Sequence, residues 1–170
     1  MYASFGKKMY QASDSNAAGI AIAELVQKLK DREAPQSEFD AGFEQIVHTK
    51  RHASQKALVQ YILKKIALFE GQPHIGETED LTIEHLVPQS SIGTVFEEST
   101  VGQVGNLLLV DAETNRLLST SDFNKKKEIL TGRGYKLPDL LVNADELDKD
   151  LIQQNTNRLS ELARDAVWKV

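Results

Sequence analysis

The 170-residue sequence contains no cysteine, a single tryptophan and four prolines, and it has no long hydrophobic run. The absence of cysteine excludes disulfides, thiolate zinc sites and a cysteine nucleophile. No stretch approaches the roughly 18–20 consecutive apolar residues that a membrane-spanning helix needs, and no signal peptide opens the chain. We therefore expect a cytoplasmic protein.

Basic residues are missing from the middle of the chain. No Lys or Arg occurs between Ile66 and Asn115, a stretch rich in Glu and Asp, whereas residues 48–56 and 125–136 carry basic clusters. The formal net charge of −5 argues against a surface covered with positive charge, but it does not exclude nucleic acid as a partner. An acidic stretch beside a basic helix can hold a cation next to a phosphate backbone, although solvated faces of ordinary helices give the same pattern.

Apolar periodicity predicts helices on both sides of this acidic stretch. One begins at Asp14 or Ser15, and another runs from Ser54 to Glu70. Residues 72–80 are expected to form a polar loop. Near the C-terminus, Asn143 and Glu146 have the spacing of a capping box before a long amphipathic helix with apolar residues between 147 and 167.

The central segment has a different pattern. Leu81–Val87 and Leu107–Val110 are short runs of Leu, Ile and Val bounded by turn residues, which predicts two strands, and Asn115–Leu130 is typical of a helix. We therefore predict a mainly helical α+β protein. Its parts are a helical scaffold (1–80), a strand–loop–strand–helix unit (81–130), and a connector with a long helix (131–170), packed as one compact domain.

Polar residues stand at the joints of the central unit, and they suit the hydrolysis of a phosphodiester. Glu84 and His85 are neighbours on a strand, so their side chains point to opposite faces. A histidine can accept a proton from water near neutral pH, and a carboxylate with an amide oxygen, here from Asn115, can hold Mg²⁺ beside a phosphate. Asn106 is placed to hydrogen-bond the backbone around His85, and Lys126 to contact phosphate.

The same residues carry a family resemblance. The sequence has E-H-x-x-P-Q at 84–89, G-N-L-x-L at 105–109, an asparagine nine residues after Asn106, and F-x-x-K at 123–126. This series resembles the HNH (ββα-metal, His-Me finger) nucleases. More narrowly, it resembles the C-terminal domain of the GmrSD-type modification-dependent restriction and phage-defence enzymes.

The resemblance implies a ββα-metal unit embedded in a helical scaffold, and a metal-dependent DNA endonuclease or nickase. It implies that His85 is the general base, that Glu84 and Asn115 are metal ligands, that Asn106 orients the site and that Lys126 contacts phosphate. The implied cofactor is a divalent metal, Mg²⁺ or alternatively Mn²⁺.

The implied substrate is DNA, with modified or phage DNA among the candidates. In such enzymes an N-terminal ParB-like nucleotide-hydrolysing domain precedes this one, which leaves open that the chain is an excised C-terminal fragment.

Other interpretations stay open. The chain can be a DNA-binding module with a weak or inactive nuclease centre, or a helical domain that docks a partner through residues 147–167. Glu84 can simply pair with a lysine, and Asn115 can cap a helix. His48 and His52 have an i, i+4 spacing that binds metal on a helix, but no third ligand lies near them in the sequence.

Overall fold

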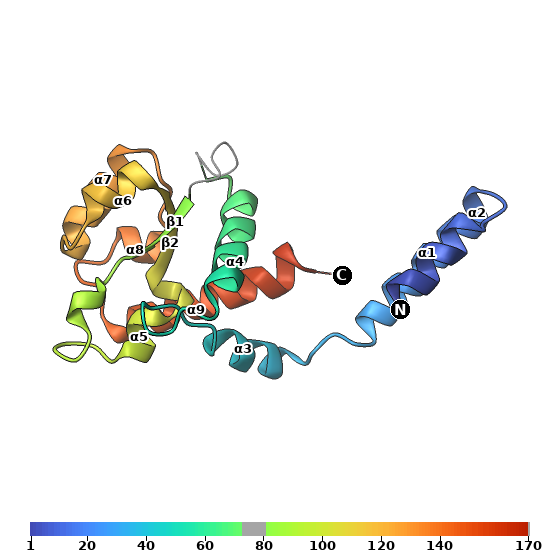
Figure 1. Ribbon diagram of the computed structural model, residues 1–170, viewed down its shortest axis with the longest axis horizontal. Coiled ribbons are helices and arrows are strands. Elements are labelled where there is room, and N and C mark those ends of the chain that lie inside the picture. The colour runs from blue at the N-terminus through green and yellow to red at the C-terminus, as the bar shows by residue number, and fades with distance from the viewer. Residues whose placement is uncertain (73–80, 170) are drawn as a thin grey trace. The chain divides into compact units, whose positions relative to one another are not determined.

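The structure is a computed structural model that describes residues 1–72 and 81–169 (Figure 1). The predicted polar loop at 72–80 lies outside the described residues from residue 73 onward. The chain forms two compact units, Met1–Glu38 and Phe39–Lys169. The predicted three-part division at residues 80 and 130 stays a prediction.

The first unit contains α1 (Tyr2–Tyr10) and α2 (Ser15–Lys30), and α3 (Gln36–Glu44) begins in it and ends in the second. The remaining elements, where η marks a short 3₁₀ or π turn, are α4 (Lys56–Phe69), β1 (Leu81–His85), η1 (Gln89–Ser91), α5 (Glu98–Gly102), η2 (Val104–Asn106), β2 (Leu107–Asp111), α6 (Ala112–Leu118), α7 (Phe123–Gly132), α8 (Asp139–Val142), α9 (Lys149–Leu162) and η3 (Ala163–Val167). This confirms the predicted mainly helical α+β class. Across the described ranges, no helix is both long and apolar enough to cross a membrane.

The sheet separates two hydrophobic cores in the second unit. Strands β1 and β2 are antiparallel, with Ile83 opposite Leu109 and His85 opposite Leu107. Leu107 and Leu109 belong to the core formed with α4 and the end of α9, whereas Val110 belongs to the core formed with α6, α7 and α8. Figure 1 shows α4 on one side of the strands and α6 and α7 on the other. Because side chains alternate along a strand, each face of β1 meets different helices.

Two capping aspartates define the helices after β2. Asp111 Oδ1 accepts a hydrogen bond from the Thr114 amide at 2.7 Å and begins α6, and Asp122 Oδ1 accepts one from the Lys125 amide at 2.8 Å and begins α7. Between them Ser119 has a φ of 44°, which ends α6. The prediction of one helix over Asn115–Leu130 is therefore wrong. Asn115 lies inside α6 and does not cap it.

The N-terminal and C-terminal helices also show how capping sets helix starts. Asp14 begins α2, as predicted, by accepting from the Ala17 amide at 2.8 Å. The capping box predicted at Asn143 and Glu146 is wrong, because Asp148 caps α9 and Asn143 follows α8. The apolar residues of α9 pack into the two cores, so this face of the helix is covered.

The turn before β2 approaches α9 very closely at Gly105. The Gly105 amide donates to Thr156 Oγ1 at 3.1 Å, and Asn155 Nδ2 donates to the Gly105 carbonyl at 2.7 Å. A Cβ atom on Gly105 would lie 2.3 Å from the Ile152 carbonyl oxygen. The glycine therefore lets the chain enter β2 directly on the surface of α9.

We expect Gly105→Ala to lower the free energy of unfolding by about 1–3 kcal/mol, because backbone atoms of α9 would have to move. Gly132→Ala is the matched control, since nothing lies within 4 Å of its added Cβ. Urea denaturation of both variants measures the difference. Equal stability of the two variants would contradict the close approach.

Candidate active site

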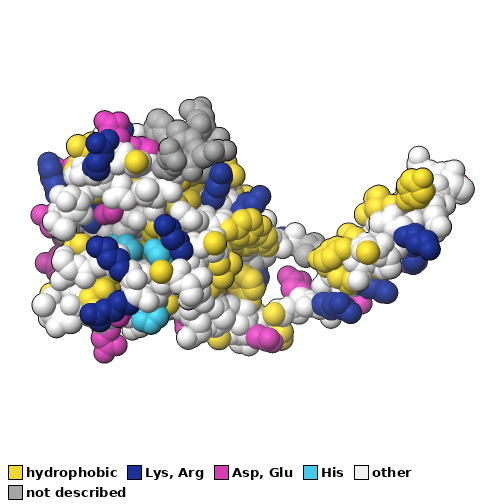
Figure 2. All heavy atoms as spheres, in the orientation of Figure 1, with side chains coloured by type: hydrophobic (Ala, Val, Ile, Leu, Met, Phe, Trp, Pro, Cys, Tyr) yellow, Lys and Arg dark blue, Asp and Glu magenta, His cyan; other side chains and the backbone are white. Residues whose placement is uncertain are grey.

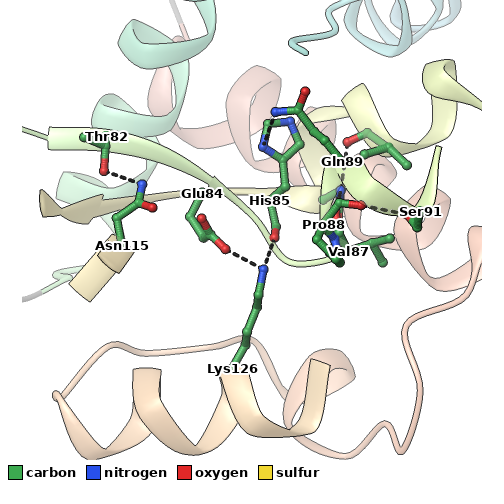
Figure 3. A network of polar contacts seen from close by, with 11 residues as sticks. Thr82, Glu84, His85, Val87, Pro88, Gln89, Ser91, Asn115 and Lys126 are labelled. Carbon is green, nitrogen blue, oxygen red and sulfur yellow. Dashed lines mark hydrogen bonds and ion pairs between the residues drawn. The ribbon is translucent and has the colours of Figure 1, made fainter. Parts of the chain in front are cut away.

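A pocket of about 620 Å³ lies over the end of β1. Four of the five predicted site residues line it, namely Glu84, His85, Asn115 and Lys126. They come from β1, α6 and α7, which are up to 42 residues apart in the chain. Figure 3 shows Glu84 and His85 pointing to opposite sides of β1, with Lys126 reaching up from α7.

The hydrogen bonds of His85 define its tautomer. His85 Nε2 lies 2.9 Å from the His48 carbonyl oxygen, and Nδ1 lies 3.4 Å from Gln89 Nε2. A carbonyl oxygen only accepts, so Nε2 must carry the ring proton of the neutral imidazole. Nδ1 is then unprotonated, and it accepts a hydrogen bond from Nε2 of Gln89, which also lines the pocket.

Burial keeps this imidazole neutral. It lowers the pKa of His85 to about 4, and the neighbouring charges of Lys126 and Lys50 act in the same direction. The His48 ring lies beside it, with the ring centroids 6.1 Å apart. At neutral pH Nδ1 of the His85 ring is therefore unprotonated.

Asn106 does not line the pocket, but it holds the chain that follows β1. It is fully buried; its Oδ1 accepts from the Val87 amide at 2.7 Å, and its Nδ2 donates to the Val87 and Val101 carbonyls. The backbone contact expected near His85 is therefore made two residues beyond it. The orienting role itself stays a prediction.

Glu84 and Lys126 form a buried ion pair. Lys126 Nζ donates to Glu84 Oε1 at 2.5 Å and to the His85 carbonyl oxygen at 2.6 Å. Burial raises the pKa of the Glu84 carboxyl, and the lysine opposes this effect. Both side chains are almost completely shielded from solvent. The pairing with a lysine, left open from the sequence, is thus made inside the site itself.

The carboxamide of Asn115 is oriented by Thr82. The Thr82 hydroxyl donates to the Val110 carbonyl oxygen at 3.2 Å, so it accepts from Asn115 Nδ2, at 2.7 Å. The side-chain oxygen of Asn115 takes no part in these bonds, and Figure 3 shows it on the side of Glu84.

The side-chain oxygens of Glu84 and Asn115 suit a hard cation that binds through few protein ligands. One carboxylate oxygen of Glu84 and the Asn115 oxygen match Mg²⁺, which keeps several waters and binds through few protein groups. Within the described ranges, no cluster of three or more His, Cys, Asp or Glu residues can hold a metal. His48 and His52 lie on an irregular segment rather than a helix, and His52 Nδ1 is 3.3 Å from Glu98.

The structure adds residues to the site that the motifs did not assign. Gln89 is the last residue of E-H-x-x-P-Q, and the basic cluster before α4 contributes Lys50 and Arg51 to the pocket lining. Ser119, with its positive φ, and Thr120 complete the wall between α6 and α7. The quoted motif could have pointed to Gln89, but no local signal places the cluster over the pocket.

The lysines of α7 have intramolecular partners. Lys125 pairs with Glu128 at 2.8 Å, Lys126 with Glu84, and Lys127 donates to the Ala144 carbonyl. Each lysine of the run at 125–127 therefore has a partner within the chain, and only the Lys126 pair is buried.

The comparisons with known proteins agree with the motifs. The family model described as GmrSD restriction endonucleases, C-terminal domain, matches residues 34–162, more than half of the chain. No match was found among curated proteins or among solved structures. The matched range includes every predicted site residue, and α1 and α2 lie outside it.

We expect Lys126→Met to destabilise the metal-free protein by about 3–5 kcal/mol, because it leaves the Glu84 charge buried without a partner. Adding Glu84→Gln should recover most of this loss. Lys125→Met is the matched control, since Lys125 is exposed, and it should have little effect. Chemical denaturation in EDTA compares the variants, and equal losses for Lys125→Met and Lys126→Met would refute the buried pair.

Proposed function

We propose that this chain, which belongs to the family of GmrSD restriction endonuclease C-terminal domains, hydrolyses DNA phosphodiester bonds as a metal-dependent nuclease of the HNH type. Membership in this family makes it a restriction endonuclease domain and implies DNA as the substrate. The observation that carries the finer proposal is the lining of the pocket, which combines the neutral imidazole of His85, unprotonated at Nδ1, with the carboxylate of Glu84 and the carboxamide of Asn115.

In this proposal His85 is the general base. Its Nδ1 takes a proton from water as the water oxygen attacks phosphorus, and the bond from phosphorus to the leaving oxygen breaks. The Nε2–H bond to the His48 carbonyl holds the ring while its charge changes. Asn106 supports this geometry because it fixes the backbone of Val87, two residues after His85.

Glu84 and Asn115 would hold a divalent metal, Mg²⁺ or Mn²⁺. When bound, such an ion polarises a phosphoryl oxygen and stabilises developing negative charge. Glu84 Oε1 already accepts from Lys126, so the proposed ligand atom is its second oxygen. Thr82 keeps the oxygen of Asn115 turned to the same side.

The position of Lys126 supports a positioning role. Its ammonium lies below Glu84 and joins α7 to the backbone of β1. The direct phosphate contact predicted for Lys126 stays a prediction. We assign to it the placement of Glu84 and of the His85 main chain.

Two parts of the proposal rest on family membership alone. The ParB-like nucleotide-hydrolysing domain and the recognition of modified or phage DNA are proposals for the parent protein.

A DNA-binding module without cleavage remains the second function. The lysine already bound to Glu84 is the observation that favours it, because the metal and the lysine share one carboxylate.

The base is tested by His85→Ala in a plasmid-nicking assay with Mg²⁺ and with Mn²⁺. We expect the rate to fall by about 10²–10⁴, because the variant lacks the imidazole that accepts the proton from water in this proposal. Circular dichroism verifies that the variant is folded. Nicking at an undiminished rate by folded His85→Ala would remove this residue from the mechanism.

The metal ligands are tested by titrating Mg²⁺ against the nicking rate of Glu84→Gln and Asn115→Ala. We expect both variants to need more metal for half-maximal rate, and EDTA to abolish cleavage by the native chain. Asn124→Ala is the matched control, because this asparagine of α7 bonds the Asp145 carbonyl and does not line the pocket. A metal response identical to that of the native chain would exclude the altered residue as a ligand.

A further inference from the structure

The loop of residues 47–53 lies outside the strand–loop–strand–helix unit but is tied to it at His48 and at Lys50. The His48 carbonyl accepts from His85 Nε2, and the Lys50 amide donates to Gln89 Oε1 at 2.9 Å. The His48 amide also donates to the Gly102 carbonyl at 2.8 Å. Two of these bonds go to side chains of the E-H-x-x-P-Q motif, so the motif itself fixes the backbone of this loop.

Lys50 brings an uncommitted positive charge to the pocket. Its side chain lines the pocket, and it has no ion-pair partner in the part of the chain that the structure describes. The other two cations of the lining are engaged, Lys126 with Glu84 and Arg51, more loosely, with Glu98 at 3.8 Å. The charge of Lys50 also contributes to the lowered pKa of His85, which places its ammonium within electrostatic range of that ring.

Hydroxyl groups line the same pocket. Ser90, Ser119 and Thr120 contribute to its wall. Figure 2 shows basic and histidine side chains gathered on one face of the second unit. Proteins hold DNA phosphates with Lys and Arg side chains and with Ser and Thr hydroxyls, so the lining has the composition of a phosphate-binding surface.

We propose that Lys50 and the hydroxyl-bearing wall form a binding subsite for a backbone phosphate of the DNA strand that enters the pocket. The proposal rests on the proposed function, which it deepens by naming the residue that meets the substrate backbone. An exposed lysine is ordinarily a solvated charge. Here the tethered loop holds the lysine over the pocket, which lowers the entropy lost when it meets a phosphate. The contact is independent of DNA sequence, because a phosphate carries no base information.

The test measures the binding of one fluorescein-labelled DNA duplex by anisotropy across a salt series, in EDTA so that no cleavage occurs. The variants of the 170-residue chain are Lys50→Gln, Lys50→Arg and Lys64→Gln. Loss of one phosphate contact makes the slope of log affinity against log salt shallower by about 0.9. Between about 50 and about 200 mM salt, Lys50→Gln should therefore lose about threefold less affinity than the native chain.

Lys50→Arg keeps the charge and should retain the native slope. Lys64→Gln is the matched control, because Lys64 is an exposed lysine of α4 that does not line the pocket. It should also retain the native slope. An unchanged slope in Lys50→Gln overturns the subsite, and so do equal changes in Lys50→Gln and Lys64→Gln or an absence of measurable binding by the native chain.

This experiment separates the subsite from the proposed reaction. A shallower slope in Lys50→Gln, together with no nicking by the native chain, supports the subsite and refutes hydrolysis. Nicking by the native chain together with native binding by Lys50→Gln refutes the subsite and leaves the proposed function intact.

Discussion

The buried pair of Lys126 and Glu84 is the interaction on which the rest of the site depends. It joins α7 to β1, and because Lys126 also bonds the His85 carbonyl, one ammonium fixes the backbone of both motif residues. A lysine and a glutamate out of contact with water are costly unless paired and hydrogen-bonded. Their presence at this place, where well-packed apolar side chains would serve stability as well, fits a site that needs a carboxylate in a fixed position.

The two faces of β1 carry different parts of the proposed chemistry. Glu84 and Thr82 point toward α6 and α7, where Lys126 and Asn115 meet them. His85 points the other way, and its proton is held by the His48 carbonyl of a loop far outside the motif. In the proposed reaction this alternation brings base and metal ligands to the phosphate from different directions. The five-residue strand supplies the separation, since adjacent side chains cannot share a face.

The sequence predicted those features that local patterns encode. Runs of Leu, Ile and Val indicated both strands, and four of the five candidate site residues line one pocket, although their roles stay predictions. The split between α6 and α7 was missed because Ser119 takes a positive φ that its residue type does not signal. The start of α9 was missed because two capping patterns compete within six residues, and Asp148 is the one that caps the helix.

Burial was the feature hardest to derive from sequence. The spacing of the motifs placed Lys126 on a helix near the site, but it did not indicate how deeply the side chain is buried. Lys126 was therefore predicted as a phosphate contact rather than as the partner of Glu84. In the sequence, residues 48–56 could be recognised only as a cluster of basic residues. Their position at the pocket depends on hydrogen bonds between residues that are 37 and 39 positions apart.

An acidic protein need not repel DNA at its active site. In α7, Lys125 and Lys126 pair with carboxylates and Lys127 bonds backbone carbonyl oxygens, and the charge that remains available in the pocket lining comes from a loop tied to the motif. At physiological salt, interactions between exposed charges are largely screened beyond about 8 Å. A local arrangement of this kind therefore acts on a bound phosphate far more strongly than the net charge of −5 does. Lys126 also opposes the rise that burial causes in the pKa of the Glu84 carboxyl, because its ammonium stabilises the ionised form.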